Sequence, residues 1–132
     1  MADIPDESFA LRRISPDWMV PDGNGDLRVS SVAFQNIDGG MSVGLSAVLD
    51  LLARDHLDVV LDFDGYGLLK FNVGWIRALP QHVTHSPTEP EPWHGDVVGK
   101  KSTGVKKTFV NNGTDWLRRP KTSESKVDSL EP

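Results

Sequence analysis

The sequence contains no cysteine, which excludes a disulfide scaffold, a thiolate zinc site and a cysteine nucleophile. It also has no apolar run that approaches the ~20 residues of a membrane span. The first five residues include an acid, Asp3, and no basic residue, whereas a signal peptide needs a basic segment followed by an apolar one. We therefore expect a cytoplasmic protein that makes no contact with a membrane.

The length and composition fit one globular domain. The chain has 132 residues, 38% of them hydrophobic and 25% charged, so it can form one modest core but not two. Residues 86–92 contain three prolines, which remove backbone donors and favour extended geometry. We predict a single compact domain over residues 1–120 with a proline-rich connector at 86–92, followed by a polar, disordered tail at 121–132.

Alternation of apolar and polar residues predicts five strands. In the clearest run, 57–64, apolar and acidic residues alternate and only Val60 breaks the pattern. Turn-forming residues 22–26 (DGNGD) separate the first two strands. The predicted strands are residues 9–14, 27–34, 57–64, 66–71 and 94–99.

Two segments have helical periodicity. Ser42 can act as the N-cap of the first, whose apolar stripe is Leu45, Val48, Leu49 and Leu52. Ser102 can cap the second, in which Val105, Phe109 and Trp116 share one side and Gly113 weakens the helix by about 1 kcal/mol. With residues 72–79 as a single helical turn or bend, these elements predict an α+β fold: a small, mostly antiparallel sheet packed by two main helices.

Residues 59–65 (VVLDFDG) resemble the first motif of the haloacid-dehalogenase phosphatases. In that family an apolar strand ends in two carboxylates, here Asp62 and Asp64, which act as nucleophile and as acid and base near magnesium. Tyr66 stands where the family has threonine or valine, and no paired acids follow to hold the metal. Alternation on a half-exposed strand produces the same string, and we favour this interpretation.

Three further strings match metal or phosphate sites only in part. Residues 22–26 have the acid spacing of a calcium loop but lack its later glycine and glutamate. Residues 95–102 (GDVVGKKS) are one residue shorter between the glycines than a phosphate-binding P-loop. For the three histidines around the proline-rich stretch, His82, His85 and His94, no acidic second shell can be inferred, and we interpret them as surface residues. We expect no bound metal and no cofactor.

Two adjacent arginines, Arg12 and Arg13, stand in the first predicted strand. Because neighbouring strand residues point to opposite faces, one arginine shares a face with apolar neighbours whichever face is buried. A guanidinium in that position needs a partner. The interpretation we favour is a salt bridge to Asp58 or Asp62, or a position along the rim of the sheet.

An arginine on one strand and a serine pair on the next resemble the opening of the ADP-ribosyltransferase site, including its small RES-type members. In that family arginine and serine hold the dinucleotide, and a late glutamate, here Glu89 or Glu91, completes the site. The resemblance implies a nucleotide-like ligand, with arginine on phosphate and histidine available for proton transfer. The implied ligand-binding residues are Arg13, Ser30, Ser31 and His94.

The charge is unevenly distributed along the chain. Seven basic residues and one acid lie between Lys100 and Lys121, within a chain whose formal charge is −5. The predicted final helix, with Lys106 and Lys107, can dock on an acidic sheet or can present a basic face to a partner. Nucleic acid is a possible partner, but the overall negative charge disfavours it.

The segments RRISPDW, RVSSVAF, MSV and HGDVVGK are together similar to small bacterial proteins that have no known activity. Because no motif is intact, our leading hypothesis is a non-enzymatic cytoplasmic module that binds another protein. The alternative is an enzyme or binder of a nucleotide-like ligand that uses the arginine, serine and histidine residues above. Tryptophan is frequent at interface hot spots, so the expected partner-binding residues are Trp18 and Trp93, in irregular stretches that we expect to be exposed, with Lys106 and Lys107.

Overall fold

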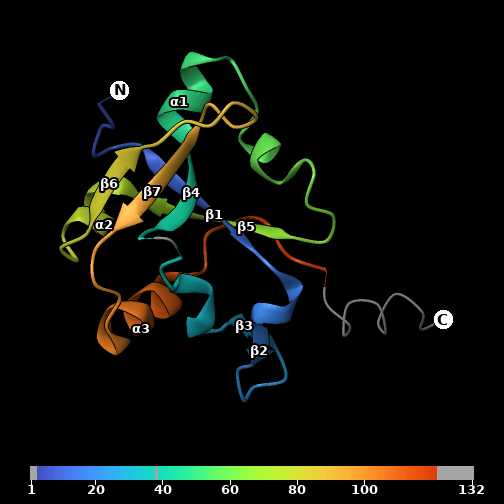
Figure 1. The fold of residues 1–132 in the computed structure, drawn as a ribbon. Helices are drawn as coiled ribbons and strands as arrows, with labels where there is room; N and C mark the ends of the chain where they lie inside the picture. Colours follow the sequence, from blue (N-terminus) through green and yellow to red (C-terminus); the bar gives the residue numbers. More distant parts are fainter. Residues whose placement is uncertain (1–2, 38, 122–132) are drawn as a thin grey trace.

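The computed structural model describes residues 3–37 and 39–121, and its main element is a six-stranded antiparallel sheet (Figure 1). The strands lie in the order β6–β7–β4–β1–β5–β8, and β2 and β3 form a separate hairpin. The chain is thus a small single-domain α+β fold, as predicted. The strands are β1 (Phe9–Ile14), β2 (Met19–Pro21), β3 (Leu27–Val29), β4 (Met41–Leu45), β5 (Gly67–Asn72), β6 (His82–His85), β7 (His94–Val98) and β8 (Trp116–Arg118).

The described residues form three α-helices, of which only α3 (Thr103–Asn112) is long. The other two, α1 (Ser46–Leu51) and α2 (Val73–Arg77), are each little more than one turn. The prediction of two main helices is therefore not confirmed. Three short 3₁₀ helices complete the set: η1 (Pro16–Trp18), η2 (Ser31–Phe34) and η3 (His56–Val60). None of the helices in this part of the chain has the length and apolar character needed to cross a bilayer.

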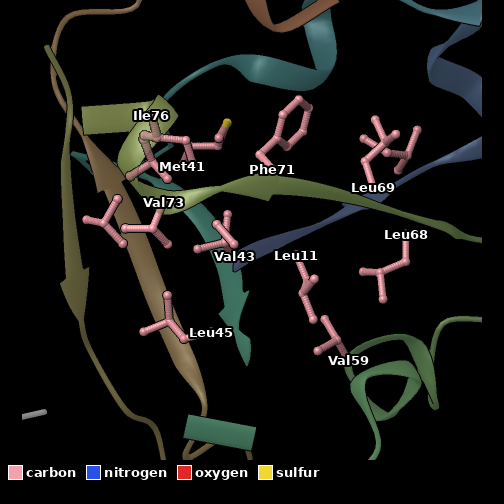
Figure 2. Close-up of a cluster of buried hydrophobic side chains, with 14 of the residues drawn as sticks. Leu11, Met41, Val43, Leu45, Val59, Leu68, Leu69, Phe71, Val73 and Ile76 are labelled. Atoms are coloured by element: carbon pink, nitrogen blue, oxygen red, sulfur yellow. The ribbon is translucent and has the colours of Figure 1, made fainter. Parts of the chain in front are cut away.

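The central strands β1 and β5 are buried on both faces of the sheet. β1 pairs with β5 along its whole length, and Figure 2 shows Leu11 and Val59 on one side of these strands and Leu69 and Phe71 on the other. All four side chains are buried. Consecutive residues such as Leu68 and Leu69 can both be apolar because each face has its own cover.

Aromatic side chains pack on the face that α3 and η2 cover. Phe34 of η2 stacks on Phe109 of α3 with ring centroids 5.2 Å apart. The ring of Phe71 meets both of them edge-on, an arrangement that aromatic pairs prefer. This cluster fixes η2, and with it the segment that precedes β4, on the sheet.

The prediction of a strand at 57–64 is wrong. Asp55 accepts a hydrogen bond from the Leu57 backbone N–H and starts η3, and turns follow. The adjacent residues Val59 and Val60 are both buried, whereas Leu61 is 70% exposed. A half-buried strand cannot bury two consecutive side chains on one face, so Val60, the one break in the alternation, indicated the helical turn.

The predicted start of the first helix is also wrong. Ser42 is not an N-cap, because residues 41–45 form β4 between β1 and β7. The helix begins only at Ser46, and its cap position, Leu45, makes no side-chain capping bond. Pairing with two neighbouring strands stabilises this segment more than its helical periodicity does. β6 (His82–His85) was not predicted at all.

Two further boundaries differ from the prediction. The predicted strand 27–34 ends at Val29 and continues as η2. Ser102 does cap α3 by accepting from the Val105 N–H, as predicted. The helix ends at Gly113, however, and Trp116 belongs to β8.

The proline-rich segment 86–92 joins β6 to β7 as a closed loop. Thr88 and Glu91 exchange two backbone hydrogen bonds, each 3.2 Å long, and the β6–β7 pair runs from His85 opposite Gly95 to His82 opposite Val98. The predicted tail, apart from Lys121, lies outside the described residues.

Close packing between β7 and its neighbours gives a test of the sheet. A Cβ on Gly95 would lie 2.7 Å from the Thr84 carbonyl oxygen and 2.7 Å from Leu45. We expect Gly95→Ala to lower the free energy of unfolding, measured by urea denaturation, by about 1–3 kcal/mol.

Gly104→Ala is the matched control, since a Cβ there meets only Ser102 Oγ at 3.9 Å within helix α3. This variant should be more stable than the wild type by about 0.5–1 kcal/mol. A Gly95→Ala protein as stable as the wild type would contradict the packing.

Candidate functional site

The central strands β1 and β4 pair over only two residues. Ala10 lies opposite Leu45 and Leu11 opposite Gly44, and the ladder then stops. β1 continues to pair with β5 as far as Ile14, so β4 turns away from it. Figure 1 shows the two strands close together near α1 and separating toward the β2–β3 hairpin. We call the opening between them the seam.

Arg12 fills the seam. Arg12 is only 7% exposed to solvent. Its Nε and Nη2 donate to the Ala33 carbonyl oxygen at 3.0 and 2.9 Å, and its Nη1 donates to the Ser42 carbonyl oxygen at 2.8 Å. The guanidinium lies 5.4 Å from the ring centroid of Trp18. Side-chain bonds from Arg12 therefore connect β1 to β4 and η2 where the backbone ladder has ended.

Within the described residues, this buried cation has no acidic partner. Among the ion pairs of residues 3–37 and 39–121, none involves Arg12. Burial, with a smaller contribution from Arg13, lowers the pKa of Arg12 to about 10. Removing a charge from water is costly unless an opposite charge compensates it, so the site favours an added anion.

Lys101 adds a second positive charge nearby. Its Nζ donates to Asn36 Oδ1 at 2.8 Å and to the carbonyl oxygens of Val97 and Gly99 at 3.0 Å each. Burial and then repulsion from Arg12 lower the pKa of Lys101 to about 8. Because Arg12 contributes to this lowered pKa, the two cations lie near enough to repel each other at the seam.

A pocket of about 330 Å³ opens at the seam, and we call it the seam pocket. Three of its residues come from the β4–β7 pair, in which Ser42 lies opposite Asp96 and His94 opposite Gly44. Its remaining wall comes from the segment between η2 and β4. The lining residues are Arg12, Gln35, Ile37, Gly40, Ser42, His94 and Asp96.

A chain of hydrogen bonds crosses this pocket. His94 Nε2 lies 3.1 Å from Ser42 Oγ, and His94 Nδ1 lies 2.9 Å from the Ser86 carbonyl oxygen. Ser86 Oγ donates to Asp96 Oδ2 at 2.6 Å and lies 3.0 Å from His94 Nδ1. Because both Ser86 oxygens act as acceptors for Nδ1, the neutral imidazole carries its proton there. Nε2 is then free to accept the Ser42 hydroxyl proton.

Arg13, the arginine that the sequence favoured, points elsewhere. Its Nη1 pairs with Glu91 Oε2 at 2.8 Å and donates to the Val59 carbonyl oxygen at 3.1 Å. Its guanidinium lies 3.9 Å from the ring centroid of Phe63. The expected salt bridge to Asp58 or Asp62 is wrong, since Arg13 pairs with Glu91 and Asp58 pairs with Arg54. Glu91 is one of the two late glutamates that the resemblance implied.

The serine and lysine pairs meet in a different place. Together they line an open groove of about 940 Å³ between α3 and the β2–β3 hairpin. The structure therefore brings Ser30 and Ser31 together with Lys106 and Lys107, and not with Arg13 or His94. Of the four residues expected to bind a nucleotide-like ligand, only His94 lies in the seam pocket.

The two tryptophans expected at a partner surface pack against the protein itself. Trp93 is only 5% exposed and lies under Arg54, whose guanidinium is 4.7 Å from a ring centroid of Trp93. The expectation that Trp93 is exposed is therefore wrong. Trp18 is half-buried against the core beside Arg12. Both rings stabilise arginine side chains through cation–π contact.

The motif-like strings do not form sites in the described part of the chain. Asp62 and Asp64 are exposed and lie in turns, not at the end of a strand. Asp22 Oδ1 accepts from the backbone N–H groups of Asn24 and Asp26 and closes a tight turn. Within residues 3–37 and 39–121, no three His, Asp or Glu side chains gather as metal ligands would.

Of the seven residues that line the seam pocket, sequence analysis assigned a binding role only to His94, and the six that it missed include Arg12, Ser42 and Asp96. Alternation did require one buried arginine in the Arg12–Arg13 pair, but it could not tell which one. Ser42 was hidden by the helical periodicity that follows it. Asp96 stands between Gly95 and Val97, and this alternation is common in any half-exposed strand. Nothing in the sequence therefore marked Asp96 as a site residue.

The lowered pKa of Lys101 predicts a pH effect on stability. Between pH 8 and the ordinary lysine value of 10.5, the unfolded chain holds the Lys101 proton and the folded protein does not. Stability rises with pH where the unfolded state binds more protons. We expect thermal denaturation to show that the wild type gains stability over Lys101→Met as the pH rises from 7 to 10.

Lys100→Met, a change at the exposed neighbour, is the control and should follow the wild-type trend. A constant difference between the wild type and Lys101→Met across this pH range would contradict the buried, repelled state of Lys101.

Comparison with known proteins gives no related site. No protein-family model, no curated protein and no solved structure matches the chain. The proposed function therefore rests on the geometry of the seam pocket.

Proposed function

We propose that this chain binds a small, phosphate-bearing, nucleotide-like ligand in the seam pocket. The observation that carries the proposal is the buried Arg12 guanidinium, which lines the pocket and has no acidic partner in residues 3–37 and 39–121. A phosphate group supplies the missing negative charge. The planar guanidinium matches two phosphate oxygens at once, which a lysine does not.

The donors available in the seam pocket fit this ligand class. The three bonds that Arg12 makes to carbonyl oxygens use only part of its N–H donors. Lys101 adds positive potential to the seam, and the Ser42 hydroxyl faces the pocket. Phosphate can accept hydrogen bonds from the unused Arg12 donors and from the Ser42 hydroxyl, whereas Lys101, whose three donors are engaged elsewhere, contributes only its charge.

The volume of the seam pocket and the Asp96 carboxylate in its wall restrict the class of ligand further. A volume of about 330 Å³ is at the small end of ligand sites, which run from ~300 to ~1,000 Å³. It suits a sugar phosphate and is small for a whole dinucleotide. Asp96 can accept hydrogen bonds from sugar hydroxyls. We therefore favour a mononucleotide or pentose phosphate, bound in the cytoplasm of a bacterial cell.

Calorimetric titration and thermal shift with inorganic phosphate, ribose 5-phosphate and AMP test this function. A ligand at 100 times its Kd should stabilise the wild type by about 2.7 kcal/mol. Arg12→Gln, checked for folding by circular dichroism, should lose the binding.

A second variant, Asp96→Asn, should change the phosphate affinity in the opposite direction. Because it removes a negative charge from the pocket and keeps an acceptor for Ser86, phosphate affinity should rise roughly fivefold, the effect of about 1 kcal/mol. Asp62→Asn removes an exposed acid outside the pocket and is the control. Absence of phosphate binding in both the wild type and Asp96→Asn would end the proposal.

A second candidate function is the binding of another protein through α1 and η3, and exposed leucines favour it. Leu51 is 80% exposed and Leu61 is 70% exposed, and Leu52 and Leu57, which lie between them in the sequence, are 44% and 41% exposed. Exposed apolar side chains close in sequence are typical of interfaces. Chemical crosslinking in extracts should then lose a defined product in the double variant Leu51→Glu/Leu61→Glu but keep it in Leu117→Glu. Identical crosslinks in both variants would exclude this surface.

A further inference from the structure

We propose that Ser42 is a nucleophile toward phosphate esters held in the seam pocket, with His94 as its general base. This inference rests on the proposed function, because it needs the phosphate group to lie at Arg12. It goes beyond binding by assigning a hydrolytic activity to the same pocket. Neither the motif of residues 59–65 nor the serine pair Ser30 and Ser31 takes part.

The first argument is the state of the His94 imidazole. Its Nδ1 is 2.9 Å from the Ser86 carbonyl oxygen, and Ser86 Oγ is committed to Asp96 by a bond of 2.6 Å. The Nδ1 proton is therefore held on the side away from Ser42. Nε2, 3.1 Å from Ser42 Oγ, keeps its lone pair for the hydroxyl proton.

This arrangement has the geometry of an activated nucleophile. A hydroxyl within about 2.6–3.2 Å of a base, with the base oriented by a third group, is the pattern that nucleophilic catalysis requires. Here Ser86 orients the imidazole and Asp96 holds Ser86. We regard both as positioning residues, because they act through His94.

The second argument is the rigidity of the supporting elements. Ser42 lies on β4 at a position that is paired with β7, and His94 begins β7. Register fixes the two strands, since Ser42 lies opposite Asp96 and Gly44 opposite His94. Groups on paired strands keep their separation better than groups on loops do.

The third argument is the charge beside the nucleophile. Arg12 Nη1 donates to the carbonyl oxygen of Ser42 itself, at 2.8 Å. The guanidinium thus contacts the backbone of the residue whose hydroxyl would attack, and both residues line the same pocket. Phosphoryl transfer depends mainly on positioning and on cations that stabilise the transferring oxygens. A guanidinium placed here favours phosphorus over an uncharged carbonyl carbon as the point of attack.

The reaction needs only the ester and water. Ser42 Oγ attacks phosphorus while its proton moves to His94 Nε2; the Oγ–P bond forms and the bond from phosphorus to the ester oxygen breaks. The imidazolium returns the proton to the leaving alkoxide, which departs as an alcohol. Water then gives a proton to His94 as its oxygen attacks phosphorus. The Oγ–P bond breaks, Ser42 recovers a proton from the imidazolium, and phosphate leaves.

A fluorophosphonate probe tests the nucleophile directly, because it phosphonylates an activated serine with loss of fluoride. We expect mass spectrometry of the wild-type protein to find the adduct on Ser42. Hydrolysis of p-nitrophenyl phosphate should be lost in Ser42→Ala and reduced about 10²- to 10⁴-fold in His94→Gln. Ser31→Ala, a change in the α3 groove, is the control and should keep both signals.

The outcomes separate this inference from the proposed function. If calorimetry shows phosphate binding to the wild type and to Ser42→Ala, but no adduct and no hydrolysis occur, the nucleophile is wrong and the binding function stands. If phosphate does not bind, both proposals fail. If Ser42 is labelled and p-nitrophenyl acetate is hydrolysed but the phosphate ester is not, the assignment to phosphate esters is overturned.

Discussion

The structure depends on the bonds that Arg12 makes across the seam between β1 and β4. The backbone ladder between these central strands ends after two residue pairs, and the guanidinium then holds the Ala33 and Ser42 carbonyl oxygens. Without those donors, the carbonyl groups of Ala33 on η2 and Ser42 on β4 would lose this partner, and an unpaired buried polar group costs about 1–3 kcal/mol. The opening is thus stabilised by a cation rather than closed by backbone pairing.

The same solution creates the site. A strand pair that closed fully would leave no pocket, and an uncharged side chain in the seam would leave no reason for an anion to enter. Because Arg12 is buried, held by neutral carbonyl groups and close to Lys101, its charge is uncompensated within the described residues. The β4–β7 register then places Ser42, His94 and Asp96 on the wall of that charged opening. Fold and chemistry therefore share one cause.

Local sequence patterns predicted correctly those elements whose tertiary contacts favour the same secondary structure as their local periodicity does. β1 has the predicted bounds, β5 and β7 differ from the prediction by one residue, and Ser102 caps α3. The prediction failed where tertiary contacts override periodicity. The alternation of 57–64 folds as η3 because both Val59 and Val60 are buried, and the helical stripe after Ser42 begins inside a strand. The site was predicted only in part. Strand geometry required one buried arginine in the Arg12–Arg13 pair, but the sequence did not show which one, because that depends on the segments that cover each face of the sheet.

Side-chain NMR of Arg12 tests the central claim most directly. An Nε–H bonded to the Ala33 carbonyl in a buried seam should exchange slowly with water, so its ¹H–¹⁵N signal should persist at neutral pH and disappear in Arg12→Lys. Addition of inorganic phosphate should shift this signal and leave that of the exposed Arg119 in place. An Arg12 signal that exchanges as fast as an exposed arginine, or that phosphate does not move, would contradict the account.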